Sequence, residues 1–248
     1  MNDSFDALYL AVFASVAIGL VLLERVGAWQ RQPVQFAHRW TSNIGLSLAG
    51  NFVTAIFVPV GVYAFALHQP PGLMSRLGVP MAAQFPLTFL FLDCWRYWEH
   101  RVYHHVPLLW RLHLVHHSDT QVDVTTSERH HPLDALLGTG VMLALVAVFG
   151  LPAPAVAVYL LVATAVALYS HANLRLPAPI GRMAAWFVVT PPVHAVHHSD
   201  AQPQTDSNFG SVLTLWDRLF GTYSDPAQTR IANFGLRYFH QPRDTRLA

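Results

Sequence analysis

Charged residues are scarce in this sequence, and lysine is missing altogether. Only 12% of the 248 residues are charged, whereas ordinary soluble domains carry roughly 25%. Every cationic side chain other than histidine is an arginine, and the formal net charge is +1 at pH 7. A near-neutral chain with 53% hydrophobic residues is typical of a protein in a lipid environment. The same charge balance gives no support to nucleic acid as a partner.

Cysteine is almost absent too. Cys94 is the single cysteine, so an internal disulfide framework and a thiolate metal cage are both excluded. The chain begins with the acidic sequence MNDSFD, whereas a cleavable signal peptide begins with positive charge. We therefore expect no cleaved leader.

Long apolar runs are abundant, and they predict membrane-embedded helices. The first three are each about as long as the hydrocarbon core of a bilayer. The last two are slightly short and are joined only by Leu151-Pro152-Ala153-Pro154, which predicts a tight helical hairpin. The runs are 7–23, 43–67, 81–98, 135–150 and 155–170. We expect an all-α integral membrane bundle with about four to five embedded helices and a cytoplasmic helical cap. A soluble helical protein with these runs as its core is the alternative.

Arginine is distributed unevenly between the loops. The loop after the first run holds Arg25, Arg31 and Arg39, whereas the loop after the second holds only Arg76. The positive-inside rule places the arginine-rich loop in the cytoplasm. The third run then delivers His100 to that side, and the hairpin returns there. We expect a multi-pass bacterial inner-membrane protein whose histidine-rich face is cytoplasmic.

Histidine is the residue present in excess, because twelve of the 15 histidines lie in or beside short motifs. The motifs are His100-x-x-x-His104, His113-x-x-His116-His117 and His194-x-x-His197-His198, joined by the single residues His131 and His171. Side chains three or four residues apart share one helix face, and adjacent ones diverge by about 100°. An adjacent pair can therefore serve two neighbouring centres. Imidazole suits Fe, Zn, Cu and Ni, so these residues predict a site for two metal ions.

Side chains near the motifs are candidates to orient such ligands. A metal-bound histidine normally donates its second ring N–H to a carboxylate or carbonyl. The candidates are Asp93, Asn173 and Asp134, and for Asp93 an ion pair with Arg96 is an equal alternative. The aromatic stripe of Phe85, Phe89, Phe91 and Trp95 is expected to pack between helices, with contact to a lipid substrate as the alternative.

Ordered motifs over residues 85–225 resemble the fatty acid hydroxylase / sterol desaturase superfamily of membrane di-metal oxygenases. They are DCWRYWEHRVYH from Asp93, LWRLHLVHHS from Leu109, DVTT from Asp123 through HPLD at His131, SHAN from Ser170, PVHAVHHS from Pro192, NFG from Asn208 and WDRLFGTY from Trp216. The resemblance implies metal ligands at His100, His104, His113, His116, His117, His131, His171, His194, His197 and His198. It does not require His105 or His130, and His38, His68 and His240 lie outside every motif. It divides the chain into N-terminal membrane helices (1–80), a catalytic domain (81–225) and a C-terminal tail (226–248).

The same resemblance implies an oxidoreductase that hydroxylates or desaturates a lipid with O2 and two metal ions, usually iron, although zinc can occupy such sites. No haem, flavin or nicotinamide motif is present, so electrons are expected from a separate ferredoxin or cytochrome with its reductase. Arg175, Arg182, Arg218 and Arg230 are a candidate docking face for that donor, with lipid headgroups as the alternative partner. Two other functions stay open, a di-zinc membrane hydrolase and a non-catalytic metal-binding membrane protein.

Overall fold

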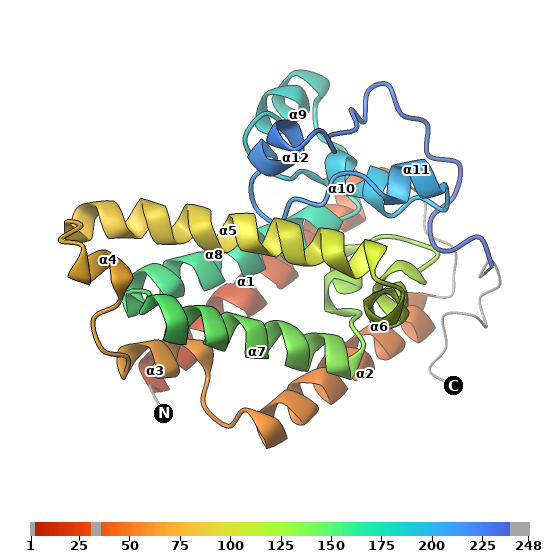
Figure 1. Ribbon diagram of the computed structural model, residues 1–248. Helices are drawn as coiled ribbons and strands as arrows, with labels where there is room; N and C mark the ends of the chain where they lie inside the picture. The colour runs from red at the N-terminus through yellow and green to blue at the C-terminus, as the bar shows by residue number, and fades with distance from the viewer. Residues whose placement is uncertain (1–2, 31–35, 239–248) are drawn as a thin grey trace.

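The chain folds into a bundle of long helices that carries a cap of short helices at one end (Figure 1). The computed structural model describes residues 3–30 and 36–238. Over those residues all of the regular elements are helices, which confirms the predicted all-helical fold. The long helices are α1 (Asp3–Gly27), α2 (Phe36–Phe57), α5 (Met81–His105), α7 (Pro132–Phe149) and α8 (Ala153–His171).

Four helical segments are long and apolar enough to cross a membrane. They are Ser4–Gly27, Ala37–Leu67, Pro132–Phe149 and Ala153–His171. The second of them is broken between α2 and α3 (Val62–Leu67), where Pro59 has no N–H to donate. The predicted run at 81–98 forms the first part of α5 but is not one of the four. Its polar side chains, among them Asp93 and Arg96, account for the difference because they reduce its hydropathy.

Helices α7 and α8 are joined by the short proline-containing linker and run in opposite directions, as predicted for a hairpin, although each packs mainly on other helices (Figure 1). Pro132 begins α7 in the first turn, where a backbone N–H has no partner within the helix and is not needed. Gly150 ends α7 in the left-handed region at φ 57°. Helix α8 then starts at Ala153. A Cβ on Gly150 would lie 2.2 Å from the Cα of Gly72, so this turn also requires a glycine for close approach.

The long helices pack in a fixed order. Helix α2 lies on α7, α1 lies on α8, and α5 lies on both α8 and α6 (Pro107–His117). Leu92, Val146 and Val156 are fully buried where α5, α7 and α8 meet. The ring of Phe89 contacts that of Tyr159 at 5.4 Å between centroids, and Phe91 contacts Phe149 at 4.8 Å. Phe89 and Phe91 therefore pack between helices, as predicted for the stripe.

The cap gathers where α5 and α8 end and α7 begins (Figure 1). Its elements are α6, the 3-10 helix η1 (Val124–Glu128), α9 (Ala178–Ala184), α10 (Pro191–His197), α11 (Gln202–Thr205) and α12 (Leu215–Leu219), while the four-residue α4 (Leu73–Arg76) lies at the opposite end of the bundle. The polar segment after residue 199 belongs to this cap. The carboxylate of Asp93 on α5 holds it in place by accepting hydrogen bonds from the backbone N–H groups of Val212 and Leu213 and from the Trp216 indole.

A buried ion-pair network joins α2 to the loop between α6 and α7. The guanidinium of Arg39 contacts Asp119 at 2.6 Å and Asp123 at 3.0 Å, and all three side chains are almost fully buried. Asn43 on the same helix donates to Asp119. Removing one partner from such a pair leaves an uncompensated buried charge, which costs about 3–5 kcal/mol. Arg39 is thus a structural residue.

We expect Gly150→Ala to destabilise the hairpin. A side chain in the left-handed region costs about 1–2 kcal/mol per residue, and here the new Cβ also meets the backbone of Gly72. The measurement is the Tm of the purified protein in detergent. Gly140→Ala is the matched control, because Gly140 lies inside α7 with no atom within 4 Å of the position that a Cβ would occupy, and it should keep or raise the Tm. Equal Tm values for the two variants would contradict this account of the turn.

Candidate metal centre

Nine histidines converge in two groups at the cap end of the bundle. In each group every residue offers one ring nitrogen, and these nitrogens lie within 4.8 Å of one another. The first group is His100, His104, His113, His117 and His197, and the second is His116, His171, His194 and His198. These two sets are called the first and second histidine groups below.

Helical spacing explains how neighbouring residues reach different groups. On α6, His113 and His117 are four residues apart and share a face, so both belong to the first group. His116 precedes His117 and belongs to the second group. The pair at the end of α10 divides in the same way, with His197 in the first group and His198 in the second. This division is the one that the 100° offset between adjacent helical residues predicts.

The outward-facing Nδ1 atom of most of these rings is held by an oxygen. Backbone carbonyls lie 3.0 Å from His100, 2.8 Å from His197, 3.2 Å from His116 and 2.7 Å from His171. A carbonyl oxygen can only accept, so Nδ1 carries the proton in these four rings. Their Nε2 atoms are then unprotonated and each carries a free lone pair, which is the form of imidazole that binds a metal.

In the first group these lone pairs have no other partner. The buried Nε2 atoms of His100, His113 and His197 make no hydrogen bond with any described residue, and the same holds for both nitrogens of His117. A buried polar atom without a partner costs about 1–3 kcal/mol. One ion shared by the group would satisfy the Nε2 atoms of His100, His113 and His197 and one of the two nitrogens of His117.

In the second group the lone pairs face each other directly. Nε2 of His116 lies 3.2 Å from Nε2 of His171, and the Nε2 atoms of His194 and His171 are 2.9 Å apart. His116 and His171 each hold their proton on Nδ1, so no hydrogen bond can form between them. Two nitrogens bound about 2.1 Å from one metal at roughly a right angle lie about 3 Å apart. The geometry therefore fits a cation.

Burial keeps these imidazoles in the neutral, ligating form. It lowers the pKa of His117, His194 and His198 well below the ordinary value of 6.5, and the neighbouring histidines lower it further. The physical cause is that a charged imidazolium loses its hydration in the apolar interior.

His131 is the one predicted ligand that lies outside both groups. Its backbone is extended ahead of Pro132, and its Nδ1 accepts from the backbone N–H of Leu133 at 3.1 Å. It caps α7. The resemblance does not require the preceding residue, His130, as a ligand, and its ring stacks on that of His116 with centroids 4.7 Å apart. His130 also forms a third small group with His113 and Asp134.

Of the three side chains expected to orient ligands, the structure places only Asp134 beside a histidine. Its carboxylate lies 3.4 Å from Nδ1 of His113 and 3.2 Å from that of His130. Asp93 holds the 212–216 segment, and among the described residues it pairs neither with a histidine nor with Arg96. Asn173 instead exchanges hydrogen bonds with the backbone of Gln30.

Sequence reasoning missed the loop that supplies two of the four carbonyls, those of Ser207 and Phe209. Asn208 adopts φ 54°. Its side-chain amide donates hydrogen bonds to the carbonyls of Val193 and Ser224 and accepts one from the backbone N–H of Ser224. The carboxylate of Asp217 receives the N–H groups of Phe209 and Gly210, both at 2.8 Å. These contacts aim the Phe209 carbonyl at His100. The signal was available in the motifs NFG and WDRLFGTY, which belong to the resemblance but had no assigned role.

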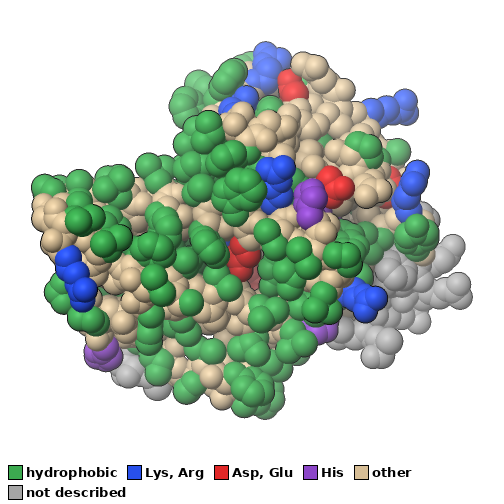
Figure 2. All heavy atoms as spheres, in the orientation of Figure 1, with side chains coloured by type: hydrophobic (Ala, Val, Ile, Leu, Met, Phe, Trp, Pro, Cys, Tyr) green, Lys and Arg blue, Asp and Glu red, His purple; other side chains and the backbone are tan. Residues whose placement is uncertain are grey.

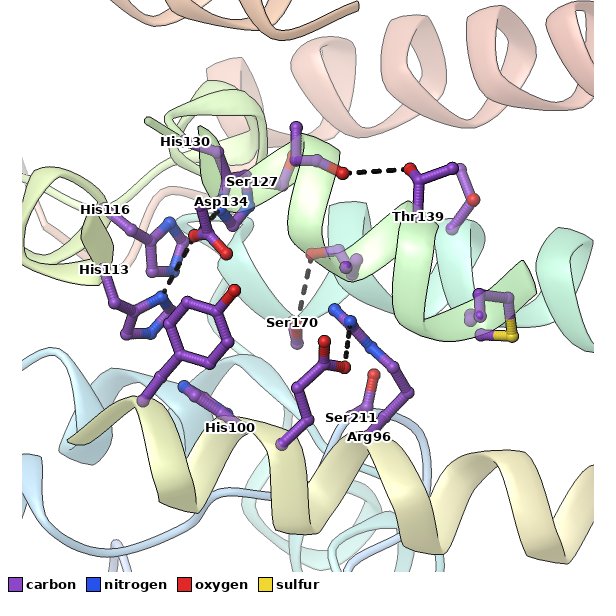
Figure 3. A pocket seen from close by; sticks show the side chains of 18 of the residues that line it. Arg96, His100, His113, His116, Ser127, His130, Asp134, Thr139, Ser170 and Ser211 are labelled. Atoms are coloured by element: carbon purple, nitrogen blue, oxygen red, sulfur yellow. Dashed lines mark hydrogen bonds and ion pairs between the residues drawn. The ribbon is translucent and has the colours of Figure 1, made fainter. Parts of the chain in front are cut away.

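A cavity of about 400 Å³ lies against both histidine groups (Figure 3). Its walls come from α5, α7 and α8, and it extends from the histidines into the bundle. Side chains of His100, His113, His116, His171 and His194 form its inner end. A substrate in this space would touch both groups.

A family model described as fatty acid hydroxylase matches residues 85–222, which is more than half of the 248-residue chain. The chain belongs to the fatty acid hydroxylase family. Every histidine of the two groups lies inside the matched region.

Curated proteins similar to this chain are named for activities on lipids. An ornithine lipid hydroxylase of Rhizobium tropici is 26% identical over 94% of this chain and 70% of its own length. An alkylglycerol monooxygenase of Xenopus tropicalis is 32% identical, over 55% of this chain and 30% of its own. A Delta(7)-sterol 5(6)-desaturase of Gibberella zeae is 31% identical over 58% and 39%, respectively. The chain thus spans less than two thirds of the latter two. No solved structure matches it significantly. These activities are oxidoreductions, so the predicted enzyme class is confirmed for the family.

We expect the metal-free form of this fatty acid hydroxylase family member to lose stability in mild acid. The folded chain keeps its histidines neutral, whereas the unfolded chain takes up protons as the pH falls below about 6.5. The unfolded state then binds more protons, so the free energy of unfolding falls as the pH decreases. The measurement is Tm in detergent between pH 8 and pH 5. A Tm that stays constant or rises on acidification would show that the groups are not buried as neutral rings.

Proposed function

We propose that this chain is a membrane-bound non-haem di-iron oxygenase that hydroxylates or desaturates a C–H bond of a lipid. The observation that carries the proposal is the pair of histidine groups, whose ring nitrogens converge without any carboxylate among them. A water-activating di-zinc hydrolase would normally use a carboxylate bridge or base. The family membership adds the oxidative chemistry.

The nine histidines would hold two irons, five nitrogens to one and four to the other. Bound there with O2 and two external electrons, the irons would supply an oxidant able to attack an unactivated C–H bond, which side chains alone cannot do. The protein's own contribution is position. The carbonyls of Phe209 and Ser207 fix the rings of His100 and His197, and the carboxylate of Asp134 does so for His113.

A lipid substrate and a bilayer fit the remaining features. Four apolar helical segments support an integral membrane protein, and the cavity reaches from the histidines into the bundle. The relatives named above act on ornithine lipids, alkylglycerols and sterols. We transfer to this chain only what they share, a lipid.

A separate ferredoxin or cytochrome with its reductase would supply the electrons. Three of the four arginines expected at its docking face, Arg175, Arg182 and Arg230, are exposed or partly exposed. Arg218 has another role, because its guanidinium lies between the rings of Trp186 and Tyr223, 4.1 and 3.8 Å from their centroids. It also donates to the carbonyl of Ala185. The docking surface that we propose therefore excludes Arg218.

We also propose that the site faces the cytoplasm of a bacterial inner membrane. The charge argument for this orientation is weaker than the sequence suggests, since Arg39 is neutralised by Asp119 and Asp123. Arg25 remains as an exposed charge in the last turn of α1, and Arg31 lies outside the described residues. The helices that carry the two histidine groups, α5, α6, α8 and α10, meet at that same end of the bundle (Figure 1).

We expect two irons per chain in protein purified from iron-replete cells without a nickel-affinity step. His197→Ala removes a ligand from the first group and His116→Ala one from the second, so each should reduce the iron content to about one or less. His131→Asn is the control: it keeps an N-capping acceptor and should retain both irons. Elemental analysis measures all four proteins. Fewer than one metal in the wild type would overturn the di-metal proposal, and loss of iron in His131→Asn would restore His131 as a ligand.

Oxygen incorporation tests the reaction itself. Cells that express the wild type under 18O2 should accumulate a lipid with a mass increase of 18 Da per labelled hydroxyl, or a mass decrease of 2 Da for a desaturation. The His116→Ala and His197→Ala variants should give neither product, while His131→Asn should. A lipid profile identical in the wild type and both alanine variants would refute the oxygenase assignment.

A further inference from the structure

The cavity contains an ion pair that the histidine groups do not use. Arg96 and Glu99 lie on α5 within about one turn of His100, and the Arg96 guanidinium donates to the Glu99 carboxylate. Both side chains line the cavity (Figure 3). Charged residues inside an apolar membrane bundle are costly, and they are retained mainly where they take part in function.

Two polar atoms beside this pair are left unsatisfied. The second carboxylate oxygen of Glu99, Oε1, is buried and makes no hydrogen bond with any described residue. The hydroxyl of Tyr159, a side chain that is 1% exposed, also has no partner of normal geometry among the described residues. Tyr159 lines the same cavity from α8. Buried polar groups are normally hydrogen-bonded, so these atoms indicate a polar ligand.

The pair is reachable from the side of the bundle. Helix α5 packs mainly on α6 and α8, and α7 packs mainly on α2 and α3. Over the described residues α5 and α7 approach each other only locally, as at Phe91 and Phe149. The Arg96 side chain is 40% exposed. Figure 2 shows an acidic side chain between the apolar surfaces of α5 and α7.

A glycine on α7 keeps this passage open. A Cβ on Gly138 would lie 3.3 Å from Nη1 of Arg96 and 3.6 Å from Oε1 of Glu99. Any larger side chain would therefore occupy the space beside the pair. Thr139 lines the same cavity from the next position on the helix.

We infer that the lipid enters between α5 and α7 and that Arg96, Glu99 and Tyr159 bind a hydroxyl or amide group that it carries close to the oxidised carbon. The Glu99 carboxylate accepts a hydrogen bond from the O–H or N–H of this group, and the Arg96 guanidinium donates a hydrogen bond to the oxygen of the group. Because the same cavity ends at His100 and His116, the anchored group brings a nearby C–H bond to the metal-binding end. This inference rests on the proposed function and narrows its substrate to lipids with a neutral polar group.

Charge balance favours a neutral group over an ionic one. Arg96 and Glu99 already compensate each other, so a phosphate would compete with Glu99 for the guanidinium and leave a buried negative charge unpaired. A quaternary ammonium would compete with Arg96 for the Glu99 carboxylate and leave the positive charge of the guanidinium unpaired. A hydroxyl or amide uses the free acceptor and the remaining guanidinium donors without changing the net charge.

Binding of matched sixteen-carbon probes tests the inference without turnover. The probes are hexadecane-1,2-diol, hexadecane, hexadecyl phosphate and hexadecyltrimethylammonium, added to the metal-loaded full chain in detergent micelles under nitrogen. Affinity is measured from the rise in Tm with the mole fraction of probe. We expect the diol to bind about tenfold or more tightly than the other three, since it gains hydrogen bonds to charged groups. Equal binding of diol and hexadecane, or tighter binding of an ionic probe, would overturn the inference.

Substitutions connect the preference to these residues. The double variant Arg96→Gln with Glu99→Gln removes both charges together, and it should weaken diol binding about tenfold while hexadecane binding stays unchanged. Gly138→Leu should abolish binding of every probe. Gly140→Leu should bind as the wild type does, because Gly140 is exposed and no atom lies within 4 Å of the position of its Cβ. Unchanged diol binding in the double variant, or in Gly138→Leu, would overturn the inference.

Iron content, measured on every sample, keeps this result separate from the proposed function. Wild-type protein that holds two irons but shows no diol preference refutes the inference about Arg96 and Glu99 and leaves the oxygenase proposal standing. Wild-type protein without iron refutes the oxygenase proposal instead. The variants should keep the wild-type iron content, because none of the four substituted residues belongs to a histidine group.

Discussion

Unprotonated imidazole nitrogens that face one another in an apolar interior are the constraint on which this structure depends. His116 and His171 approach to 3.2 Å with their protons on the far side of each ring, an arrangement that repels unless a cation lies between them. Backbone carbonyls keep the protons there. The carbonyl at His171 belongs to Ala167 inside α8, whereas the carbonyl at His116 belongs to Arg129 in the segment before α7. The centre therefore needs both the bundle and the cap segment in place.

The polar residues of the bundle are used mainly to fasten those loops. Arg39 joins α2 to the segment of Asp119 and Asp123, close to the chain that carries the Arg129 carbonyl. Asp93 fastens the C-terminal segment to α5, and Asp217 organises the turn that presents Phe209. Few charged residues are available in this chain, and several of the acids support the geometry of the centre from a distance. The Arg96–Glu99 pair is different, because it lies in the cavity and one of its acceptor atoms has no partner among the described residues.

Much of the fold and of the histidine grouping could be predicted from the sequence. Apolar run length predicted the membrane helices, and the Leu151–Pro154 linker predicted the hairpin, because these properties are local. The weaker prediction concerned the run at 81–98. There Asp93 was a candidate to orient a metal ligand or to pair with Arg96, and in the structure it anchors distant backbone instead. Likewise, the sequence shows how many arginines follow the first apolar run, but it does not show that Arg25 is exposed whereas Arg39 is neutralised by buried aspartates.

The sequence by itself determined that α6 and α10 each present histidines to two centres, since helical periodicity fixes the angle between adjacent residues. Only the tertiary structure decided which rings meet. His131 caps α7 while His130 stacks on His116, a choice set by where the chain turns ahead of Pro132. The tertiary structure also decided which carbonyls hold the rings of His100 and His197. Those carbonyls belong to Phe209 and Ser207, in a segment about a hundred residues beyond His100. Backbone carbonyls are present at every residue, so only the folded chain can select those that reach a histidine.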